Sequence, residues 1–320
     1  MWKWLPRLVV LLTFLVLTLG VIVVATESGD ACGFDWPYCN GRLYPDPFDY
    51  KQVIEYTHRL TTVLLSFVAL GNAAAFGLVP YGRRTGQAPL ALLVLLLLFT
   101  QAGVGGLNVL LGTPKGFTTL DVLVSEALWV AVIIFWARSA GSAEARRTNG
   151  RSVHGSARRA AGWLVVLVYA EIALGGFFKH SALAEVFFGL HPTRVWLDSP
   201  ALAESVYVLH GVLGVLTLIA FGALYTFVRP LSDRRVRRGA QITAVLLLLE
   251  ILAGFTVVIR GLTPFWVAAH MIMATLSLGA AAYVYGTLLE HAPHGQRSFG
   301  GLTERRDARV PTVDARQKNA

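Results

Sequence analysis

Eight apolar segments constrain this chain more than any other feature. A membrane-spanning helix needs about 20 mainly apolar residues, and runs of that kind cover residues 8–25, 53–78, 88–111, 118–138, 161–177, 203–228, 240–259 and 264–288. Hydrophobic residues make up 55% of the chain and charged residues only 15%, too few to cover a water-facing surface. We therefore predict an all-α integral membrane protein of eight transmembrane helices, the first of them retained rather than cleaved as a signal peptide.

The positive charge of the chain is explained by where its basic residues lie. The formal net charge is +9, and most of the 28 Lys and Arg residues occupy the chain ends or the loops after spans two, four and six. Basic residues concentrate on the cytoplasmic side of a membrane protein. We therefore expect a multi-pass protein with both termini in the cytoplasm, and we interpret the charge as a topological signal rather than as a nucleic-acid site.

The same loop pattern occurs twice along the chain, which indicates an internal repeat. Spans one to four and spans five to eight each have a long exterior loop, a basic interior loop and a short exterior loop. Thr113-Pro114 before span four also matches Thr263-Pro264 before span eight. We predict two pseudo-symmetric four-helix bundles, related by an axis along the membrane normal.

The repeat also gives the expected domain boundaries. The N-terminal bundle takes residues 1–140 and the C-terminal bundle takes residues 161–290. A basic cytoplasmic linker at 141–160 connects them, and the polar tail at 291–320 is expected to be disordered.

Three histidines lie at the exterior ends of spans, where polar side chains are costly and become functional candidates. His210 and His270 occupy spans six and eight at similar depth in one bundle. A lone buried histidine is more often a hydrogen-bonded structural residue. Two imidazoles that face each other across an apolar bundle, however, suit axial ligation of haem iron, whereas these spans supply no cysteine for zinc.

The first bundle departs from this pattern. His58 matches His210, but the position that corresponds to His270 holds Asp121. A haem in this bundle would have one imidazole ligand and an open or carboxylate-assisted face, with Glu126 as a second candidate partner. An open face suits oxygen activation and two imidazoles favour electron transfer, so we expect one reactive bundle and one conductive bundle.

Both cysteines of the chain lie in the acidic exterior loop at 26–52. Cys32 and Cys39 are well placed for a local disulfide in an oxidising compartment. The residues alone leave two roles open for this pair, a structural clip or a redox-active disulfide.

The cysteine loop and the segment after it carry a family resemblance. The loop Cys-Gly-Phe-Asp-Trp-Pro-Tyr-Cys-Asn-Gly at 32–41, followed by Glu-Tyr-Thr-His-Arg at 55–59, closely resembles the haem A synthase family of aerobic bacteria and mitochondria. His210-Gly211 and the segment 264–270 fit the second half of that family. The resemblance covers about residues 8–288 and implies a bacterial plasma-membrane oxidoreductase, which oxidises the C8 methyl group of haem O to a formyl group and so makes haem A for terminal oxidases.

The resemblance also implies roles for individual residues. His210 and His270 would ligate a resident haem b, His58 would address the substrate haem O, and Glu55 would be the essential carboxylate. Asp121 departs from the family, which has a fourth histidine there. Implied partners are haem O, a haem O synthase and an electron acceptor, within membrane lipid; a homo-oligomer is a further candidate assembly.

Other polar residues have two interpretations each. Glu55 could accept a proton or stabilise cationic charge, or could be a helix-end acid paired with Arg59. Arg59 and Arg260 are candidate partners for the haem propionates. Lys179 and His180 could serve similarly or lie at the interface, and Glu171 and Glu250 could join a proton path or bond between helices.

Two rival functions remain open at this point. A bis-His haem b cytochrome would transfer electrons without modifying haem, and a thiol oxidant would use the cysteine pair, although it usually needs a second, closer pair. An oxidase assembly subunit without turnover is a further alternative if Asp121 has abolished activity.

Overall fold

The protein is all-helical over the part that the structure describes. The computed structural model describes residues 4–34, 36–78, 86–139, 151–191 and 196–290. Eight helices there are long and apolar enough to cross a membrane. The elements are α1 (Leu5–Ala25), α2 (Tyr50–Ala73) with its π-helical continuation η2 (Ala74–Leu78), α4 (Ala88–Leu110), α5 (Phe117–Ser139), α6 (Arg151–His180), the short α7 (Leu183–Phe187), α8 (Pro200–Val228), α9 (Arg234–Arg260) and α10 (Pro264–Glu290). The predicted all-α membrane fold is confirmed.

Several helices extend beyond their predicted spans. α6 begins at Arg151, so residues 151–160 of the expected linker are helical, and α9 begins at Arg234 rather than near 240. Hydropathy marks only the lipid-buried part of a helix, and a basic first turn can continue the same helix into the headgroup region. Most of the remaining linker and the whole tail lie outside the described residues.

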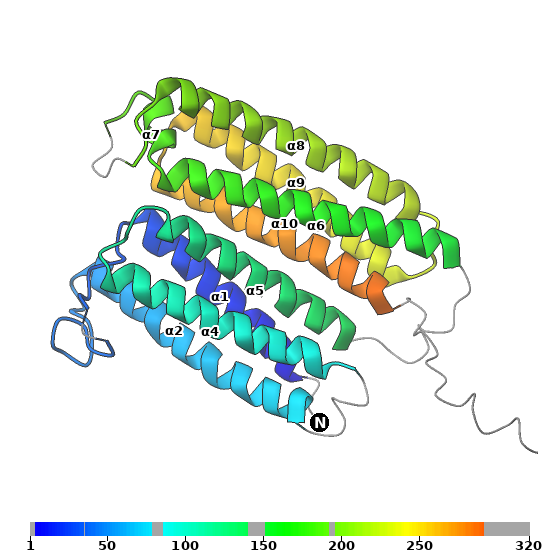
Figure 1. The fold of residues 1–320 in the computed structure, drawn as a ribbon, viewed down its shortest axis with the longest axis horizontal. Coiled ribbons are helices and arrows are strands. Elements are labelled where there is room, and N and C mark those ends of the chain that lie inside the picture. Colours follow the sequence, from blue (N-terminus) through cyan, green and yellow to red (C-terminus); the bar gives the residue numbers. More distant parts are fainter. Residues whose placement is uncertain (1–3, 35, 79–85, 140–150, 192–195, 291–320) are drawn as a thin grey trace, which may run out of the picture.

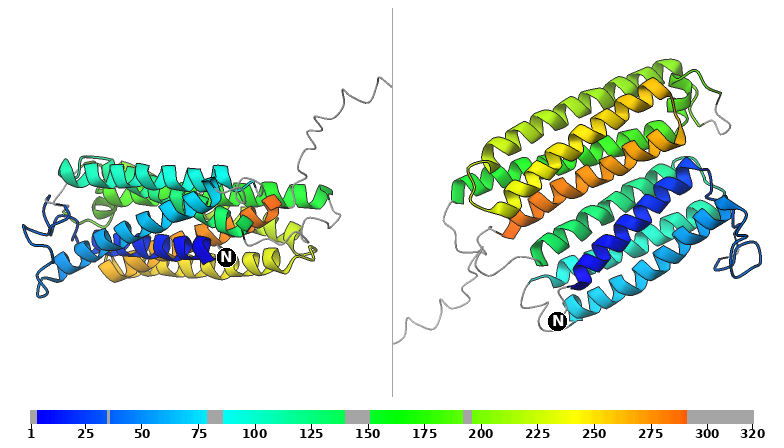
Figure 2. Two further views of the ribbon diagram at one scale, coloured as in Figure 1. Left: turned by 90° about the horizontal axis from the view of Figure 1, so that it is seen from below. Right: turned by 180° about the vertical axis from the view of Figure 1, so that it is seen from behind.

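The long helices form two sets of four (Figure 1). In the N-terminal half, α1 packs on α2 and α5, and α4 packs on α2 and α5; in the C-terminal half, α10 packs on α6 and α9, and α6 packs on α8. Figure 2 shows the same two sets from behind. The pseudo-symmetry between the halves stays a prediction.

The outer surface of both halves is apolar, as a lipid-facing surface must be. One cluster of buried apolar side chains lies within the N-terminal half, and a second joins the C-terminal half to Trp129 and Ile133 of α5. Many large apolar residues on the long helices nevertheless remain exposed, among them Leu96, Ile219 and Ile259. A soluble monomer rarely exposes so much apolar surface. Since helices satisfy their own backbone groups, this surface can face hydrocarbon without loss of hydrogen bonds.

The two halves meet mainly along α5 and α10. Two glycines of α10 permit this close approach, because an added Cβ would lie 2.7 Å from Trp129 Nε1 at Gly279 and 3.0 Å from the Ala137 Cβ at Gly286. The Trp129 indole donates a hydrogen bond of 2.8 Å to the Thr275 carbonyl. The Thr275 hydroxyl in turn donates to Glu126 Oε1 at 2.6 Å. Small residues and a few polar contacts therefore hold the halves together.

The two exterior segments predicted from the sequence lie at one end of the molecule. This end, which we call the loop end, carries residues 26–49 and α7, and the N-terminus lies at the opposite end (Figure 1). The helix starts there are set by their caps. Asp49 accepts hydrogen bonds from the backbone amides of Lys51 and Gln52 at the start of α2, and Ser199 caps α8 just before Pro200.

Candidate functional site

His210 and His270 face each other inside the C-terminal half. His210 comes from α8 and His270 from α10, and their ring centroids lie 6.3 Å apart with the ring planes at 86°. With a metal–nitrogen bond of about 2.0 Å and about 1.1 Å from nitrogen to ring centre, two imidazoles on opposite faces of one metal would have centroids about 6.2 Å apart. The spacing of this pair therefore fits two axial ligands of one haem iron.

The other two helices of the C-terminal half make room for these rings with glycine. A Cβ added at Gly175 of α6 would lie 3.3 Å from His210 Cε1, and one added at Gly254 of α9 would lie 3.2 Å from His270 Cε1. Any larger residue would push against an imidazole. All four helices of this half thus contribute to one site.

The two imidazoles differ in their hydrogen bonds. His270 Nδ1 lies 3.1 Å from the backbone carbonyl of Glu250, which can only accept, so Nδ1 is the protonated nitrogen and Nε2 is free to bind metal. His210 Nδ1 is buried without a hydrogen-bond partner among the described residues. The donor set and the spacing of the two rings fit a bis-imidazole haem.

Two of the predicted site residues in the N-terminal half also lie close to glycines of neighbouring helices. A Cβ at Gly20 of α1 would lie 3.6 Å from His58 Nε2, and a Cβ at Gly105 of α4 would lie 3.4 Å from Asp121 Oδ1. Asp121 also accepts a hydrogen bond of 2.8 Å from Gln101 Nε2. The half therefore presents an imidazole from α2 and a carboxylate from α5, each opposite a glycine.

Glu55 and Arg59 fasten the cysteine loop to α2. Glu55 is 3% exposed; its Oε2 accepts a hydrogen bond of 2.7 Å from the Cys32 amide, and its Oε1 pairs with Arg59. The Arg59 Nη2 group also donates to the Gly33 carbonyl at 2.8 Å, and Nη1 donates to the Tyr38 carbonyl at 3.4 Å. Both residues predicted to serve the haem site are engaged by this loop.

The predicted local disulfide is present. Cys32 and Cys39 are joined by an S–S bond of 2.05 Å, and both side chains are buried, at 0% and 1% exposed. Burial beneath the loop is what a structural clip requires, whereas a redox-active pair needs access to its partner.

The other predicted polar residues differ in exposure and in their contacts. Arg260 is exposed at the end of α9. Lys179 pairs with Glu185 of α7, and His180 Nε2 is buried without a partner among the described residues. In α6, Glu171 accepts a hydrogen bond of 3.2 Å from Thr217 of α8.

Sequence reasoning missed Gln101 and the four glycines. The interval from Gly105 to Asp121 equals the interval from Gly254 to His270, and this equality could have identified these two glycines.

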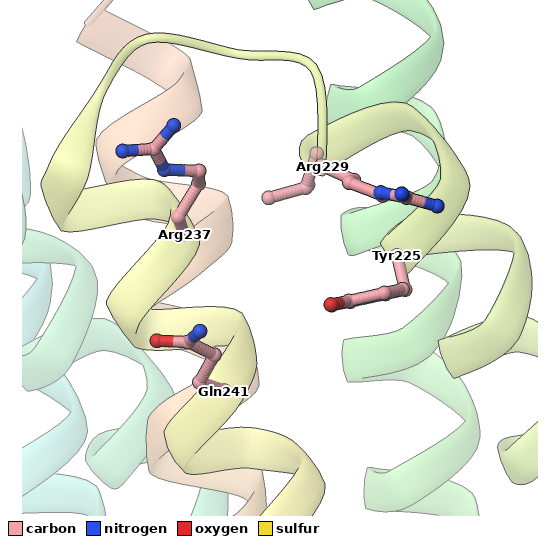
Figure 3. A pocket seen from close by; sticks show the side chains of 5 residues that line it. Tyr225, Arg229, Arg237 and Gln241 are labelled. Atoms are coloured by element: carbon pink, nitrogen blue, oxygen red, sulfur yellow. The ribbon is translucent and has the colours of Figure 1, made fainter.

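A surface pocket lies near the other end of the C-terminal half, where α8 ends and α9 begins (Figure 3). Its volume is about 210 Å³, and its lining consists of Tyr225, Val228, Arg229, Arg237 and Gln241. The guanidinium groups of Arg229 and Arg237 point away from each other. None of the predicted site residues lines this pocket.

Comparison with known proteins decides the family. The family model described as cytochrome oxidase assembly protein (COX15-CtaA) matches residues 46–282, which include every predicted haem-site residue from Glu55 to His270. The chain belongs to this family. The resemblance inferred from the cysteine loop and the Glu-Tyr-Thr-His-Arg segment is thereby confirmed, although the matched range begins after the cysteine loop.

Similar members of the family share a name. The heme A synthase of Staphylococcus haemolyticus is 25% identical over 286 residues, which cover 88% of this chain and 93% of the relative. The heme A synthase of Halalkalibacterium halodurans is 26% identical, covering 84% of this chain and 91% of the relative. That of Exiguobacterium sp. is 24% identical, with 84% and 87% covered.

Proposed function

We propose that this chain is a haem A synthase, a membrane oxidoreductase that converts the C8 methyl group of haem O to the formyl group of haem A. Family membership and the shared name of the relatives support this function. The observation that carries it is the pairing of His210 with His270 in one half, together with the placement of His58 and Asp121 opposite glycines in the other. Two unequal haem positions suit an enzyme in which one haem is the substrate and the other is resident.

The resident group is a haem b held by His210 and His270. A haem with two imidazole ligands supplies one-electron transfer. Gly175 and Gly254 leave room for the rings, and the contact of His270 Nδ1 with the Glu250 carbonyl leaves Nε2 free to bind the metal. The apolar helices around the pair exclude water from the site.

The substrate site is assigned to the N-terminal half, with His58 as the ligand of haem O. Glu55 lies three residues before His58 and so shares its face of α2. Its proposed role is to accept a proton or to stabilise positive charge as the methyl group is oxidised. The same carboxylate contacts the Cys32 amide and Arg59, so the cysteine loop lies next to the proposed proton acceptor. Arg59 and Arg260 are the proposed cationic partners of the haem propionates.

The enzyme is proposed to lie in the plasma membrane of a bacterium with both termini in the cytoplasm. The basic residues at the chain ends and in three of the loops support this orientation. The loop end is then exterior, in a compartment that permits the Cys32–Cys39 disulfide. Haem O, its synthase and an electron acceptor are the proposed partners, and self-association is a further proposal.

Haem analysis after co-expression tests the function. The chain is expressed with a haem O source, and the extracted haems are separated by chromatography and identified by mass. Haem A or its alcohol precursor is the expected product. Unchanged haem O, with haem b as the only haem bound to the purified protein, would overturn the proposal in favour of a bis-His cytochrome.

Two variants sharpen this test. Glu55→Ala should stop conversion while haem b stays bound, and an exposed polar residue at the opposite end, changed as Gln241→Ala, should leave conversion unaltered.

A further inference from the structure

Asp121 occupies the position in the N-terminal half that His270 occupies in the C-terminal half. Each of the four groups, His58, Asp121, His210 and His270, faces a glycine on the long helix that precedes its own in the same half, and two of these glycine intervals are equal in length. The halves thus differ in the chemistry of one matched position, an imidazole in one and a carboxylate in the other.

The Asp121 carboxylate is held against α4. Gln101 lies one turn before Gly105 on the same face of α4, and its Nε2 donates to Asp121 Oδ1 at 2.8 Å. In the other half, the residue one turn before Gly254 is Glu250, whose backbone carbonyl binds His270. In each half, the residue one turn before the glycine therefore orients the group. The backbone carbonyl of Glu250 orients His270, and the side-chain amide of Gln101 orients Asp121.

A carboxylate in this position ends short of where an imidazole nitrogen would reach. Aspartate is a shorter side chain than histidine, and from a matched backbone position its oxygens stop before the point that His270 Nε2 attains. The bond from Gln101 draws Oδ1 further toward α4. In a haem site built like that of His210 and His270, Asp121 would therefore be too short to reach the iron.

The α4 face beside Asp121 carries further hydrogen-bond acceptors. Gln101 Oε1 and Asn108 Oδ1 are buried and have no hydrogen-bond partner among the described residues. Asn108 follows Gly105 by three residues and so shares the face of α4 that carries Gln101 and Gly105. Buried acceptors without partners call for a small donor such as water.

We propose that the substrate haem in the N-terminal half is held by a single imidazole, that of His58, and that Asp121 binds a water molecule on the opposite axial side. Gln101 is a positioning residue that holds Asp121 for this contact. The inference rests on the proposed function, because it requires a haem in the N-terminal half.

Spectroscopy of the purified protein, loaded by co-expression with a haem O source, tests the ligand count. We expect one low-spin haem, assigned to His210 and His270, and one high-spin haem that binds carbon monoxide when reduced. His58→Ala identifies the second haem by removing it. Asp121→His should convert that haem to the low-spin form and abolish its carbon monoxide binding, whereas Asp121→Ala should leave it high-spin.

A second readout tests the positioning role of Gln101. The stretching frequency of carbon monoxide bound at the second haem reports polar groups beside it. Gln101→Leu should shift this frequency in the same direction as Asp121→Ala, and the double variant should shift it no further. Gln101→Asn keeps an amide donor on a shorter side chain and should shift the frequency less than Gln101→Leu does. Gln241→Leu serves as the control.

The outcomes separate this inference from the function on which it rests. A second haem that is low-spin in the wild type, and that becomes high-spin in Asp121→Ala, would overturn the inference and make Asp121 an iron ligand, with the function intact. An unchanged carbon monoxide frequency in both Gln101→Leu and Asp121→Ala would also overturn it. A protein that never binds a second haem, in the wild type or in Asp121→His, would overturn the inference and the proposed substrate site together.

Discussion

The carboxylate of Glu55 accepts a hydrogen bond of 2.7 Å from the backbone amide of Cys32, across 23 residues of sequence. The same carboxylate pairs with Arg59, which in turn binds the Gly33 and Tyr38 carbonyls. A residue expected to act on haem is therefore also the residue that fastens the disulfide loop to α2.

Removal of the Glu55 carboxylate should loosen the cysteine loop. Glu55→Ala leaves the Cys32 amide without its acceptor and removes the carboxylate that pairs with Arg59, a loss of about 1–3 kcal/mol of local stability and thus about 5- to 150-fold more frequent opening of the loop. The reduction rate of the Cys32–Cys39 disulfide by a soluble thiol, followed by maleimide labelling, should rise accordingly. Glu55→Gln keeps an acceptor for the Cys32 amide and should show a smaller increase. Equal rates in all three proteins would contradict the fastening role.

Loss of either imidazole in the C-terminal half should remove the low-spin haem b signal. His210→Ala and His270→Ala each leave one face of the site without a nitrogen ligand, so the low-spin absorption and paramagnetic resonance signals should disappear or turn high-spin. His191→Ala, at an exposed position in the segment before α8, is the matched control. A low-spin spectrum that survives in both ligand variants would exclude this ligand pair.

Substitution of the glycine opposite His270 should lower haem b binding as much as substitution of a ligand does. Gly254→Val adds a branched side chain where even a Cβ would lie 3.2 Å from His270 Cε1, so it should displace the ring and lower haem b occupancy. Gly222 on α8 has no atom within 4 Å of an added Cβ, and Gly222→Val should retain the haem. Haem content per protein, measured by the pyridine haemochrome assay, compares the two. Similar haem occupancy in both variants would argue against the need for glycine at position 254.

The contact between Trp129 and Gly279 should govern the association of the two halves. Gly279→Ala places a Cβ 2.7 Å from the indole nitrogen, and such overpacking costs about 1–3 kcal/mol. The thermal midpoint in detergent should fall relative to wild type, while Gly103→Ala, which meets open space, should leave it unchanged or slightly raised. If both variants unfold at the wild-type temperature, the close approach of α5 and α10 contributes little to stability.

The sequence predicted the spans well because the bilayer imposes a simple requirement on them. Each long apolar run became a helix, since no other local structure satisfies backbone groups in lipid. The helix ends were less predictable. The early start of α6 at Arg151 lies in a basic, polar segment that hydropathy cannot distinguish from a loop.

The candidate site was predictable where a polar residue interrupts an apolar span. His58, Asp121, His210 and His270 were found for that reason, and the structure brings His210 and His270 together. Gln101 was missed as a site residue because a single amide within an apolar helix carries little signal without its partner on α5. The attachment of the cysteine loop to Glu55 and Arg59 depends on loop conformation, which has no periodic pattern to read.

The helices that meet at the centre of the molecule are also the ones that carry Asp121 and His270. The separation of α5 and α10 is set where the Trp129 indole packs on Gly279 and donates a hydrogen bond to the Thr275 carbonyl. The rate of electron tunnelling falls steeply with distance. In the proposed enzyme this contact therefore sets the distance between the electron donor and the electron acceptor. Trp129 would then influence turnover through the spacing of the two halves.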